Sequence, residues 1–251
     1  DVTQTAPRIA LSLRQMTKNA GKIKSASIGV QYWSAAEVKN ITQDLKSPLH
    51  IVSSHSTRLE DVATTTTFIC PTDQIELINK ITQLLSSTSE ITTNTNNDID
   101  KQAERIANDL KSAKNPFIIT GVSVKEVALF EATLQLSKRL KQLNNSAGLI
   151  CALPQANSLG LSLLTNAQNN LDAAFDQLEQ APPLTLIIME TDLYRYCEAD
   201  KLEALFDKVK NIIVLDHLLT PTAEQADLVL PTTTFAEYHG SWVNFEGRLQ
   251  P

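Results

Sequence analysis

Apolar residues follow two different spacings along this chain, and the two spacings alternate from residue 98 onward. Short apolar runs predict buried strands, whereas apolar residues three and four apart predict amphipathic helices. Strands that alternate with helices are typical of a mainly parallel sheet covered by helices on both faces. The sequence therefore predicts an α/β fold. The predicted helices span 100–114, 124–143, 172–180 and 201–210, and the predicted strands span 116–120, 147–153, 184–189 and 212–215.

The N-terminal third predicts the same fold class with a less regular pattern. A first helix is expected to stop at Gly21, and a half-exposed strand is expected where Ile28, Val30 and Tyr32 alternate with other residues. Ser34 and Glu37 have the spacing of a capping box, which predicts a helix that ends before Pro48. The predicted helices are 5–18, 34–46, 56–62 and 72–85, and the predicted strands are 27–32 and 49–52.

The apolar pattern fails between these two regions. Residues 86–97 read SSTSEITTNTNN, which has almost no apolar content and cannot repay the entropy of becoming ordered. We therefore predict two α/β units. Residues 1–85 form a first, partial unit, 86–98 a linker or long loop, and 99–251 a second, Rossmann-like unit with a C-terminal tail.

The composition argues against two classes of partner. The chain has 22 basic and 28 acidic residues, a formal charge of −6, which gives no electrostatic reason to bind nucleic acid. No segment approaches the roughly 18 apolar residues of a membrane helix, and the N-terminus lacks a signal-peptide pattern. Direct membrane insertion is therefore not expected, and any membrane association would come through partner proteins.

The sequence predicts neither a metal site nor catalytic residues. The three cysteines are far apart, whereas iron–sulfur and zinc sites need clustered thiolates. The closest histidine pair is five residues apart, which does not place both on one helical face. Spacing alone assembles no nucleophile, base and orienting partner from the acidic and basic side chains. These cysteine, histidine, acidic and basic residues are Cys70, Cys151, Cys197, His50, His55, Asp192, Arg195, Glu237, His239, Glu246 and Arg248.

The strongest candidate for a ligand site follows the strand 212–215. Asp216 and His217 stand at its carboxyl end, and Thr220 with Pro221 opens a short helix that contains Thr222. In an open α/β sheet, ligands bind where strand ends and helix N-termini meet, so this geometry suggests a nucleotide crevice. The alternative is that Asp216 caps the following turn and that His217 is an ordinary histidine.

A second strand end is expected at the same crevice. Thr120 ends the strand 116–120, and Gly121 follows it ahead of a helix, where free backbone N–H groups can bind phosphate. The sequence lacks the G-x-G-x-x-G pattern of dinucleotide loops. The alternative interpretation is therefore that Gly121 serves only the backbone geometry of the turn. The six candidate cofactor-binding residues are Asp216, His217, Thr220, Thr222, Thr120 and Gly121.

Several motifs resemble one protein family. The C-terminal stretch contains T-x-T-A-x-x-A-D-L-V-L-P, starting at Thr220, and then F-A-E-x-x-G-S-x-V-N-x-E-G-R-x-Q. Shorter matches are K-N-P-F-I-I-T-G at 114–121, N-S-L-G-L at 157–161 and M-E-T-D-L-Y-R at 189–195, with weaker ones at 1–8 and 58–63. Together they resemble the molybdopterin oxidoreductase superfamily, and in particular its branch in the G chain of bacterial NADH:quinone oxidoreductase, respiratory complex I.

The resemblance implies a function and partners. It implies a scaffold domain of the peripheral arm, in contact with other complex I subunits and held on the cytoplasmic side of the bacterial inner membrane. It implies no cofactor here, with iron–sulfur clusters in an N-terminal region that precedes this piece, and a vestigial crevice. Both ends are expected to be cut points within a longer chain. The alternative is the pterin-dinucleotide-binding part of a catalytic enzyme of formate dehydrogenase type.

Overall fold

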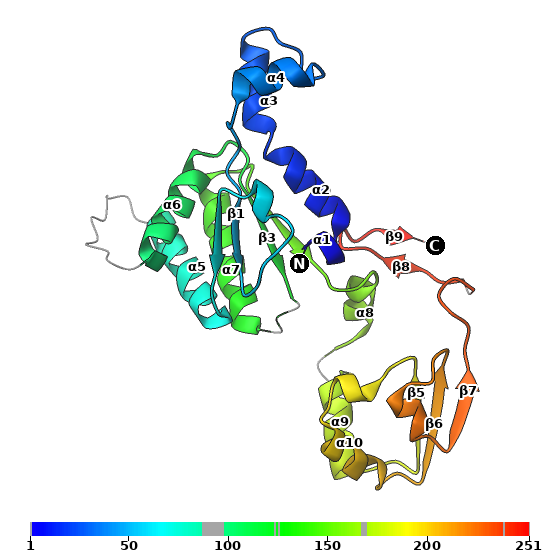
Figure 1. The fold of residues 1–251 in the computed structure, drawn as a ribbon. Coiled ribbons are helices and arrows are strands. Elements are labelled where there is room, and N and C mark those ends of the chain that lie inside the picture. Colours follow the sequence, from blue (N-terminus) through cyan, green and yellow to red (C-terminus); the bar gives the residue numbers. More distant parts are fainter. Residues whose placement is uncertain are drawn as a thin grey trace. The chain divides into compact units, whose positions relative to one another are not determined.

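The computed structural model confirms an α/β fold with small parallel sheets (Figure 1). It describes residues 2–86, 98–122, 124, 126–166, 170–237 and 239–250. The chain divides into two compact units, residues 1–155 and 156–251, and each is described here by itself.

The first unit begins with four short helices. Helices α3 and α4 lie side by side as a hairpin, seen at the top of Figure 1. A Cβ atom added at Gly21 would lie only 3.0 Å from Cγ2 of Thr42, so the glycine lets the two helices approach closely. The helices are α1 (Val2–Thr5), α2 (Pro7–Met16), α3 (Asn19–Ser27) and α4 (Ala35–Thr42).

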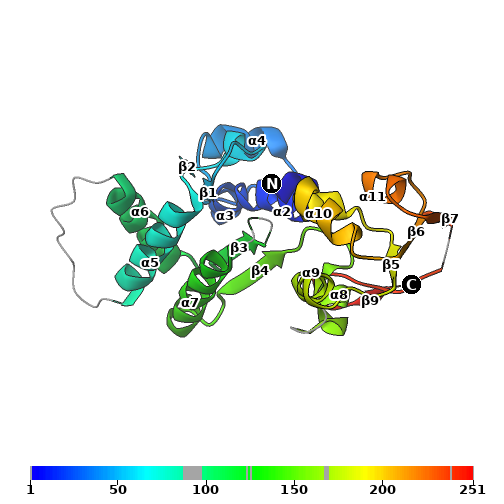
Figure 2. The same cartoon turned by 90° about the horizontal axis from the view of Figure 1, so that it is seen from below.

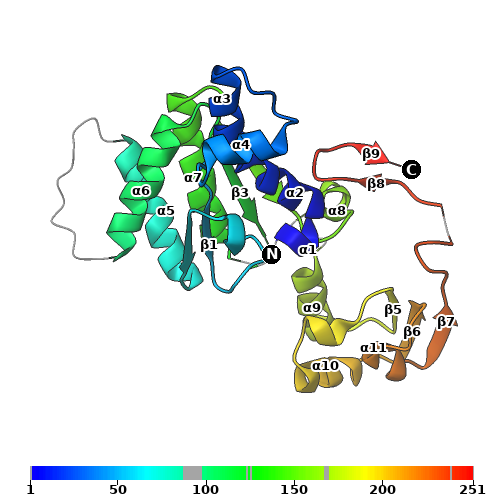
Figure 3. The same cartoon turned by 45° about the horizontal axis from the view of Figure 1, so that its top comes forward.

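Two pairs of parallel strands and three long helices complete the first unit. Helix α5 packs against both α6 and α7, as Figure 3 shows. Their buried leucines and alanines form one core with Val52 and Ile118 of the strands. The strands are β1 (His50–Ser53) paired with β2 (Thr65–Phe68), and β3 (Phe117–Gly121) paired with β4 (Gly148–Ala152). The helices are η1 (Glu60–Val62), α5 (Pro71–Ser86), α6 (Asp98–Ser112) and α7 (Val127–Leu143).

The division into units differs from the boundary expected at 86–98. Helices α5 and α6, which flank that segment, share one core, because the apolar face of α6 packs on Leu77, Ile81 and Leu85. Residues 87–97 lie outside the described residues. The linker itself therefore stays a prediction.

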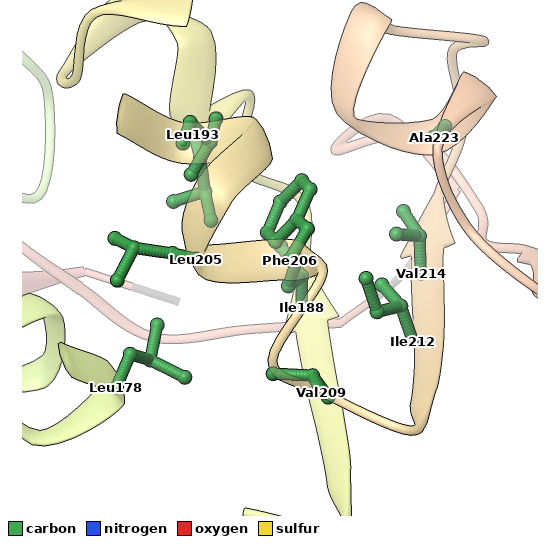
Figure 4. Close-up of a cluster of buried hydrophobic side chains, with 10 residues drawn as sticks. Leu178, Ile188, Leu193, Leu205, Phe206, Val209, Ile212, Val214 and Ala223 are labelled. Carbon is green, nitrogen blue, oxygen red and sulfur yellow. The ribbon is translucent and has the colours of Figure 1, made fainter. Parts of the chain in front are cut away.

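The second unit contains a three-stranded parallel sheet in the order β5-β6-β7 (Figure 2). Helices α9, α10 and α11 contribute to one core against the side chains of Ile188, Ile212 and Val214, as Figure 4 shows. The strands are β5 (Thr185–Met189), β6 (Asn211–Asp216) and β7 (Leu228–Pro231). The helices are α8 (Ser158–Leu164), α9 (Leu171–Gln180), η2 (Leu193–Arg195), α10 (Ala199–Phe206) and α11 (Pro221–Glu224), and a hairpin of β8 (Trp242–Val243) and β9 (Leu249–Gln250) follows.

Within the second unit, helices cover one face of this sheet. Connections that run β5 to β6 to β7 in a single direction place their helices on the same side, because such crossovers are right-handed. The opposite face presents two cross-strand rows of apolar residues, in which Ile187 and Met189 are 62% and 64% exposed. The rows are Ile187–Ile213–Leu228 and Met189–Leu215–Leu230.

Several local predictions in the N-terminal region were wrong. Gly21 lies inside α3 and does not stop a helix. The strand expected at 27–32 is absent, because Ser27 ends α3 and residues 28–32 belong to the turn that follows. The expected helix 56–62 is reduced to the single 3-10 turn η1, and β2 was missed. Ser34 precedes α4 but its side chain caps no N–H group, so the predicted capping box does not form.

An ion pair holds α2 against the η1 turn. The Arg14 guanidinium donates from Nη1 to Asp61 Oδ2 over 2.6 Å and from Nη2 to Oδ1 over 2.9 Å. This hydrogen bonding, with a smaller coulombic contribution, lowers the pKa of Asp61 below its ordinary value of 3.8.

We expect Arg14→Gln to raise the pKa of Asp61 toward 3.8. Since the folded-state pKa is depressed, the pair stabilises the fold above the ordinary pKa, and this contribution is lost as pH falls through the lowered value. An NMR titration of the Asp61 carboxyl carbon measures the shift. Arg8→Gln on the same helix is the control, and an Asp61 titration curve that stays unchanged in Arg14→Gln would contradict the prediction.

Candidate functional site

The carboxyl ends of β5 and β6 carry the residues that the sequence singled out. Asp216 is the last residue of β6, and its side chain is 4% exposed. Its Oδ1 atom accepts a hydrogen bond from the backbone N–H of Leu218 over 3.0 Å, and Nδ1 of His217 lies 3.3 Å from the same oxygen. Asp216 therefore closes the turn that follows its own strand, as the alternative reading of this residue expected.

Thr220 and Thr222 both act within the fold of α11. The Thr220 side chain accepts from the N–H of Ala223 over 3.3 Å, and Pro221 occupies the first helical position. This confirms the predicted helix start. The hydroxyl of Thr222, which is fully buried, has two partners. It accepts from the N–H of Leu193 over 2.8 Å and donates to Oδ1 of Asp192 over 2.8 Å.

Asp192 joins the ends of the two strands. It follows β5 by three residues, and its partly shielded side chain also places Oδ2 3.5 Å from Nε of the exposed Arg195. The intervening Glu190 has a φ of 47°, which is costly for a residue with a side chain, and its N–H donates to the carbonyl of Leu215 over 2.8 Å. Strained backbone and a shielded carboxylate thus meet at one edge of the sheet.

The other two predicted residues belong to the first unit. Thr120 and Gly121 end β3, as the sequence predicted, and a Cβ atom at Gly121 would lie 3.3 Å from the carbonyl oxygen of Ala152. Gly121 therefore has a close backbone neighbour that explains it without a ligand. The six candidates fall in two separate units, so a single crevice that includes all of them stays a prediction.

The edge of the β5-β6-β7 sheet fits a bound pterin dinucleotide poorly. A ligand would need donors and acceptors that are free, yet the hydroxyls of Thr220 and Thr222 already bond to Ala223, Leu193 and Asp192. Within the residues that the structure describes, no group of three His, Cys, Asp or Glu side chains is placed to hold a metal ion. Burial raises the pKa of the Cys151 thiol, which makes it a weaker ligand and nucleophile.

A cavity of about 340 Å³ opens among the C-terminal ends of α5, α6 and α7. Arg139 lines it and donates from both Nε and Nη2 to the carbonyl of Leu85, at 3.3 and 3.1 Å. This cation bonds a carbonyl in the last turn of α5, where a positive charge also complements the helix dipole. The cavity is explained by helix ends and supplies no chemistry to the strand edge.

One hydrogen-bond network that was not predicted from the sequence resembles catalytic machinery. The ring of His50 joins Oγ1 of Thr65 at 2.6 Å and Oδ2 of Asp109 at 2.8 Å, so a hydroxyl, an imidazole and a carboxylate form a chain. The chain lies at the amino ends of β1 and β2, whereas sites of parallel sheets lie at the carboxyl ends. We interpret it as a bond between α6 and the β1–β2 pair. No sequence spacing indicates it, because 59 residues separate His50 from Asp109.

The motif N-S-L-G-L at 157–161 has a structural explanation. Oδ1 of Asn157 accepts from the backbone N–H of Val243 in β8 over 2.8 Å, which ties α8 to the C-terminal hairpin. A Cβ atom on Gly160 would lie 2.1 Å from that same oxygen. The glycine therefore leaves the space in which the asparagine side chain reaches β8.

We expect Gly160→Ala to lower the free energy of unfolding by about 1–2 kcal/mol. The added methyl displaces Asn157 and leaves the Val243 N–H without its partner, which outweighs the better helix propensity of alanine. Urea unfolding measures the change. In an Asn157→Ala background the clash is absent, so Gly160→Ala should then stabilise the chain. Destabilisation by the same amount in both backgrounds would contradict this explanation.

The motif V-N-x-E-G-R in the tail is a hairpin turn. Oδ1 of Asn244 accepts from the N–H groups of Glu246 and Arg248, at 3.0 and 2.9 Å, and Gly247 has a φ of 78°. A turn of this kind requires a short polar side chain and a glycine at these positions. The Arg248 side chain is 73% exposed, and its Nη2 lies 3.9 Å from Oε2 of Glu246.

The comparisons with known proteins agree with these motifs. The family described as "Molybdopterin oxidoreductase" matches residues 86–251, more than half of the chain. The chain therefore belongs to the molybdopterin oxidoreductase family, as the resemblance predicted.

Among individual relatives, the chain is 38% identical to the NADH-quinone oxidoreductase G subunit of Shewanella oneidensis over 250 residues, which cover 100% of this chain and 28% of the relative. It is 36% identical to the protein of the same name in Pseudomonas putida and 32% identical to that of Salmonella typhimurium, each over 100% of this chain and 27% of the relative. The chain thus spans little more than a quarter of the length of these relatives. Across the part of the chain that the structure describes, no helix has the length and apolar character to span a membrane.

Proposed function

We propose that this chain is a scaffold domain within the G subunit of an NADH-quinone oxidoreductase. In this proposal it contacts other subunits of the peripheral arm of complex I, lies on the cytoplasmic side of the bacterial inner membrane and carries no redox centre of its own. The iron–sulfur clusters of the parent protein belong to a different region of the polypeptide. Support comes from the family match and from relatives that share one name at 32–38% identity.

One observation carries the scaffold role. The hydroxyls and the carboxylate at the edge of the β5-β6-β7 sheet bond to one another and to the backbone, with Thr222 bound to both Asp192 and Leu193. Such a network stabilises the turn between strands and leaves little hydrogen-bonding capacity for a cofactor. This supports a crevice that is shaped by the fold and serves structure.

The second candidate is the pterin-dinucleotide-binding part of a catalytic enzyme. One feature favours it: within the described residues Oδ2 of Asp216 has no hydrogen-bond partner, while Oδ1 is bonded to Leu218. A strand-end carboxylate of this kind can accept hydrogen bonds from a ribose or a guanine. We still favour the scaffold role, because the hydroxyls of Thr220 and Thr222, near Asp216 in the sequence, already form hydrogen bonds within the protein.

The test uses the native polypeptide that contains this chain, purified from membranes. We expect it to co-purify with other oxidoreductase subunits and to contain neither molybdenum nor pterin, as measured by metal analysis and by fluorescence of the oxidised pterin. Asp216→Asn should change the free energy of unfolding by no more than about 1–2 kcal/mol, the scale of a lost cap, and should leave electron transfer in the assembled complex unchanged.

Two contrary results would decide against this proposal. Binding of a guanine nucleotide at micromolar affinity, lost in Asp216→Asn but retained in the exposed control Asp207→Asn, would establish the cofactor-binding alternative. Purification of the polypeptide without any other subunit would instead contradict the scaffold role.

A further inference from the structure

An exposed apolar cluster lies on the hairpin of α3 and α4. The turn between the helices, residues 28–33, carries Ile28, Tyr32 and Trp33, which are 59%, 71% and 74% exposed, and Ile23 on α3 is 71% exposed. Single exposed apolar residues are ordinary on protein surfaces. Here four large ones lie within 11 residues of sequence, and two are aromatic, which is the composition of a protein interface.

The backbone of this turn is fixed by hydrogen bonds. The N–H groups of Ile28 and Val30 donate to the carbonyl of Ser25 at 3.2 and 3.0 Å, and the N–H of Ser34 donates to the carbonyl of Gln31 at 3.0 Å. The close approach of Gly21 to Thr42 holds the two helices together. The apolar residues are therefore displayed on an ordered backbone, which reduces the entropy lost on binding.

The charge of this region is opposite to that of the second unit. Residues 1–48 contain 7 Lys and Arg against 3 Asp and Glu, a net charge of +4, whereas residues 156–251 contain 5 against 14, a net charge of −9. Lys24 and Lys39 on the hairpin are exposed, and in the part of the chain that the structure describes neither forms an ion pair. The hairpin that carries the exposed aromatic residues, residues 19–42, thus has three lysines against one acidic residue, Glu37, a net charge of +2.

We propose that the α3–α4 hairpin is a docking surface for an acidic face of another protein subunit, with Tyr32 and Trp33 as the central contacts. The proposal rests on the proposed function, because it assumes assembly with other subunits. Apolar contact supplies most of the affinity, and the lysines provide orientation and a faster association. This also explains why Ile28, Val30 and Tyr32 alternate in the sequence although they form no strand: they serve contact with another molecule.

Protein fits better than the other polyanions. A nucleic acid would meet a chain whose total charge is −6. A membrane-bound helix needs a long apolar face, whereas α3 has nine residues and Ile23 is its one large aliphatic side chain. An acidic protein face with an apolar centre matches both the aromatic residues and the lysines.

The experiment is carried out in cells that produce the native polypeptide with an affinity tag. A photo-crosslinking phenylalanine analogue is placed at position 33, and at position 235 as a matched control, because Phe235 is also 74% exposed but lies in the acidic second unit. We expect position 33 to crosslink to an acidic region of one other subunit. We also expect Trp33→Ala to reduce the amount of that partner recovered at least tenfold, while Phe235→Ala has little effect.

Charge and alternative occupants are tested in parallel. Lys24→Glu should lower the amount of partner subunit recovered, and this loss should grow as the salt concentration is reduced. Lys201→Glu, at an exposed lysine of the second unit, is the control. Recovery of the complex with no effect of Trp33→Ala overturns the docking surface but not the proposed function, whereas recovery of no other subunit overturns the proposed function. Crosslinks only to a second copy of the chain, or binding to phosphatidylglycerol vesicles that Trp33→Ala abolishes without any subunit crosslink, would also overturn the proposal.

Discussion

Replacing Thr222 by valine is expected to lower the free energy of unfolding by about 2–4 kcal/mol. The Thr222 hydroxyl is completely buried and holds the N–H of Leu193 and the carboxylate of Asp192, each at 2.8 Å. Valine has nearly the same shape but leaves the buried Leu193 N–H without its acceptor and Oδ1 of Asp192 without its donor, and each such loss is costly. Urea denaturation of the wild-type and variant chains measures the difference.

Two controls separate the hydroxyl from the shape of the side chain. Thr222→Ser keeps both hydrogen bonds and removes one methyl group, so a loss of about 1 kcal/mol is expected. Thr165→Val removes an exposed hydroxyl that donates to the carbonyl of Leu161, and should change stability by no more than about 0.5 kcal/mol. If Thr222→Val were no worse than Thr222→Ser, the network would not stabilise the strand edge.

The parts of the fold that depend on local sequence were predicted well. The apolar run 212–215 forms β6, because a short run of aliphatic, mainly β-branched residues is typical of a strand in a parallel sheet. Thr220 and Pro221 start α11 as expected, since capping involves atoms three residues apart. The helices predicted at 72–85 and 100–114 also form, because their apolar residues recur at helical spacing, which is again a local pattern.

The wrong predictions in the N-terminal region have a common cause. In each case the structure depends on contacts between residues that are far apart in the sequence, or lacks a partner that the sequence pattern suggested. Strand β2 reads Thr65-Thr-Thr-Phe68, which has no aliphatic residue and is recognisable only beside β1. Gly21 was expected to stop a helix. Its actual role is to let α3 approach Thr42, which lies 21 residues further along the chain, so the local sequence does not show it. The alternation from Ile28 to Tyr32 looked like a strand, although no strand pairs with it in the described residues.

The candidate site shows the same limit. Sequence located Asp216, Thr220 and Thr222 at a strand end, which a parallel sheet dictates. The hydrogen bond from Thr222 to Asp192, 30 residues earlier, could not be predicted from the sequence. Because of this bond, the Thr222 hydroxyl supports the fold and is not free to bind a ligand. The difference between a cofactor site and a turn therefore depends on a single long-range hydrogen-bond network.

Leu202→Ala is expected to destabilise the second unit by about 2–5 kcal/mol. Leu202 is completely buried on α10, in the core that packs on β5 and β6, and its truncation leaves a cavity among well-packed neighbours. This is a large part of the total stability of an ordinary domain. Hydrogen exchange measured by mass spectrometry should therefore accelerate in peptides from 185–216.

Leu77→Ala is the matched variant in the first unit, where Leu77 is equally buried on α5. It should accelerate exchange in peptides from 71–86, 98–112 and 127–143 and leave 185–216 nearly unchanged, because each compact unit has its own core and can open separately. Leu164→Ala, at a residue that is 84% exposed, should change neither. If either core variant accelerated exchange equally in both regions, the two units would unfold as one, and the division after Gln155 would have no thermodynamic meaning.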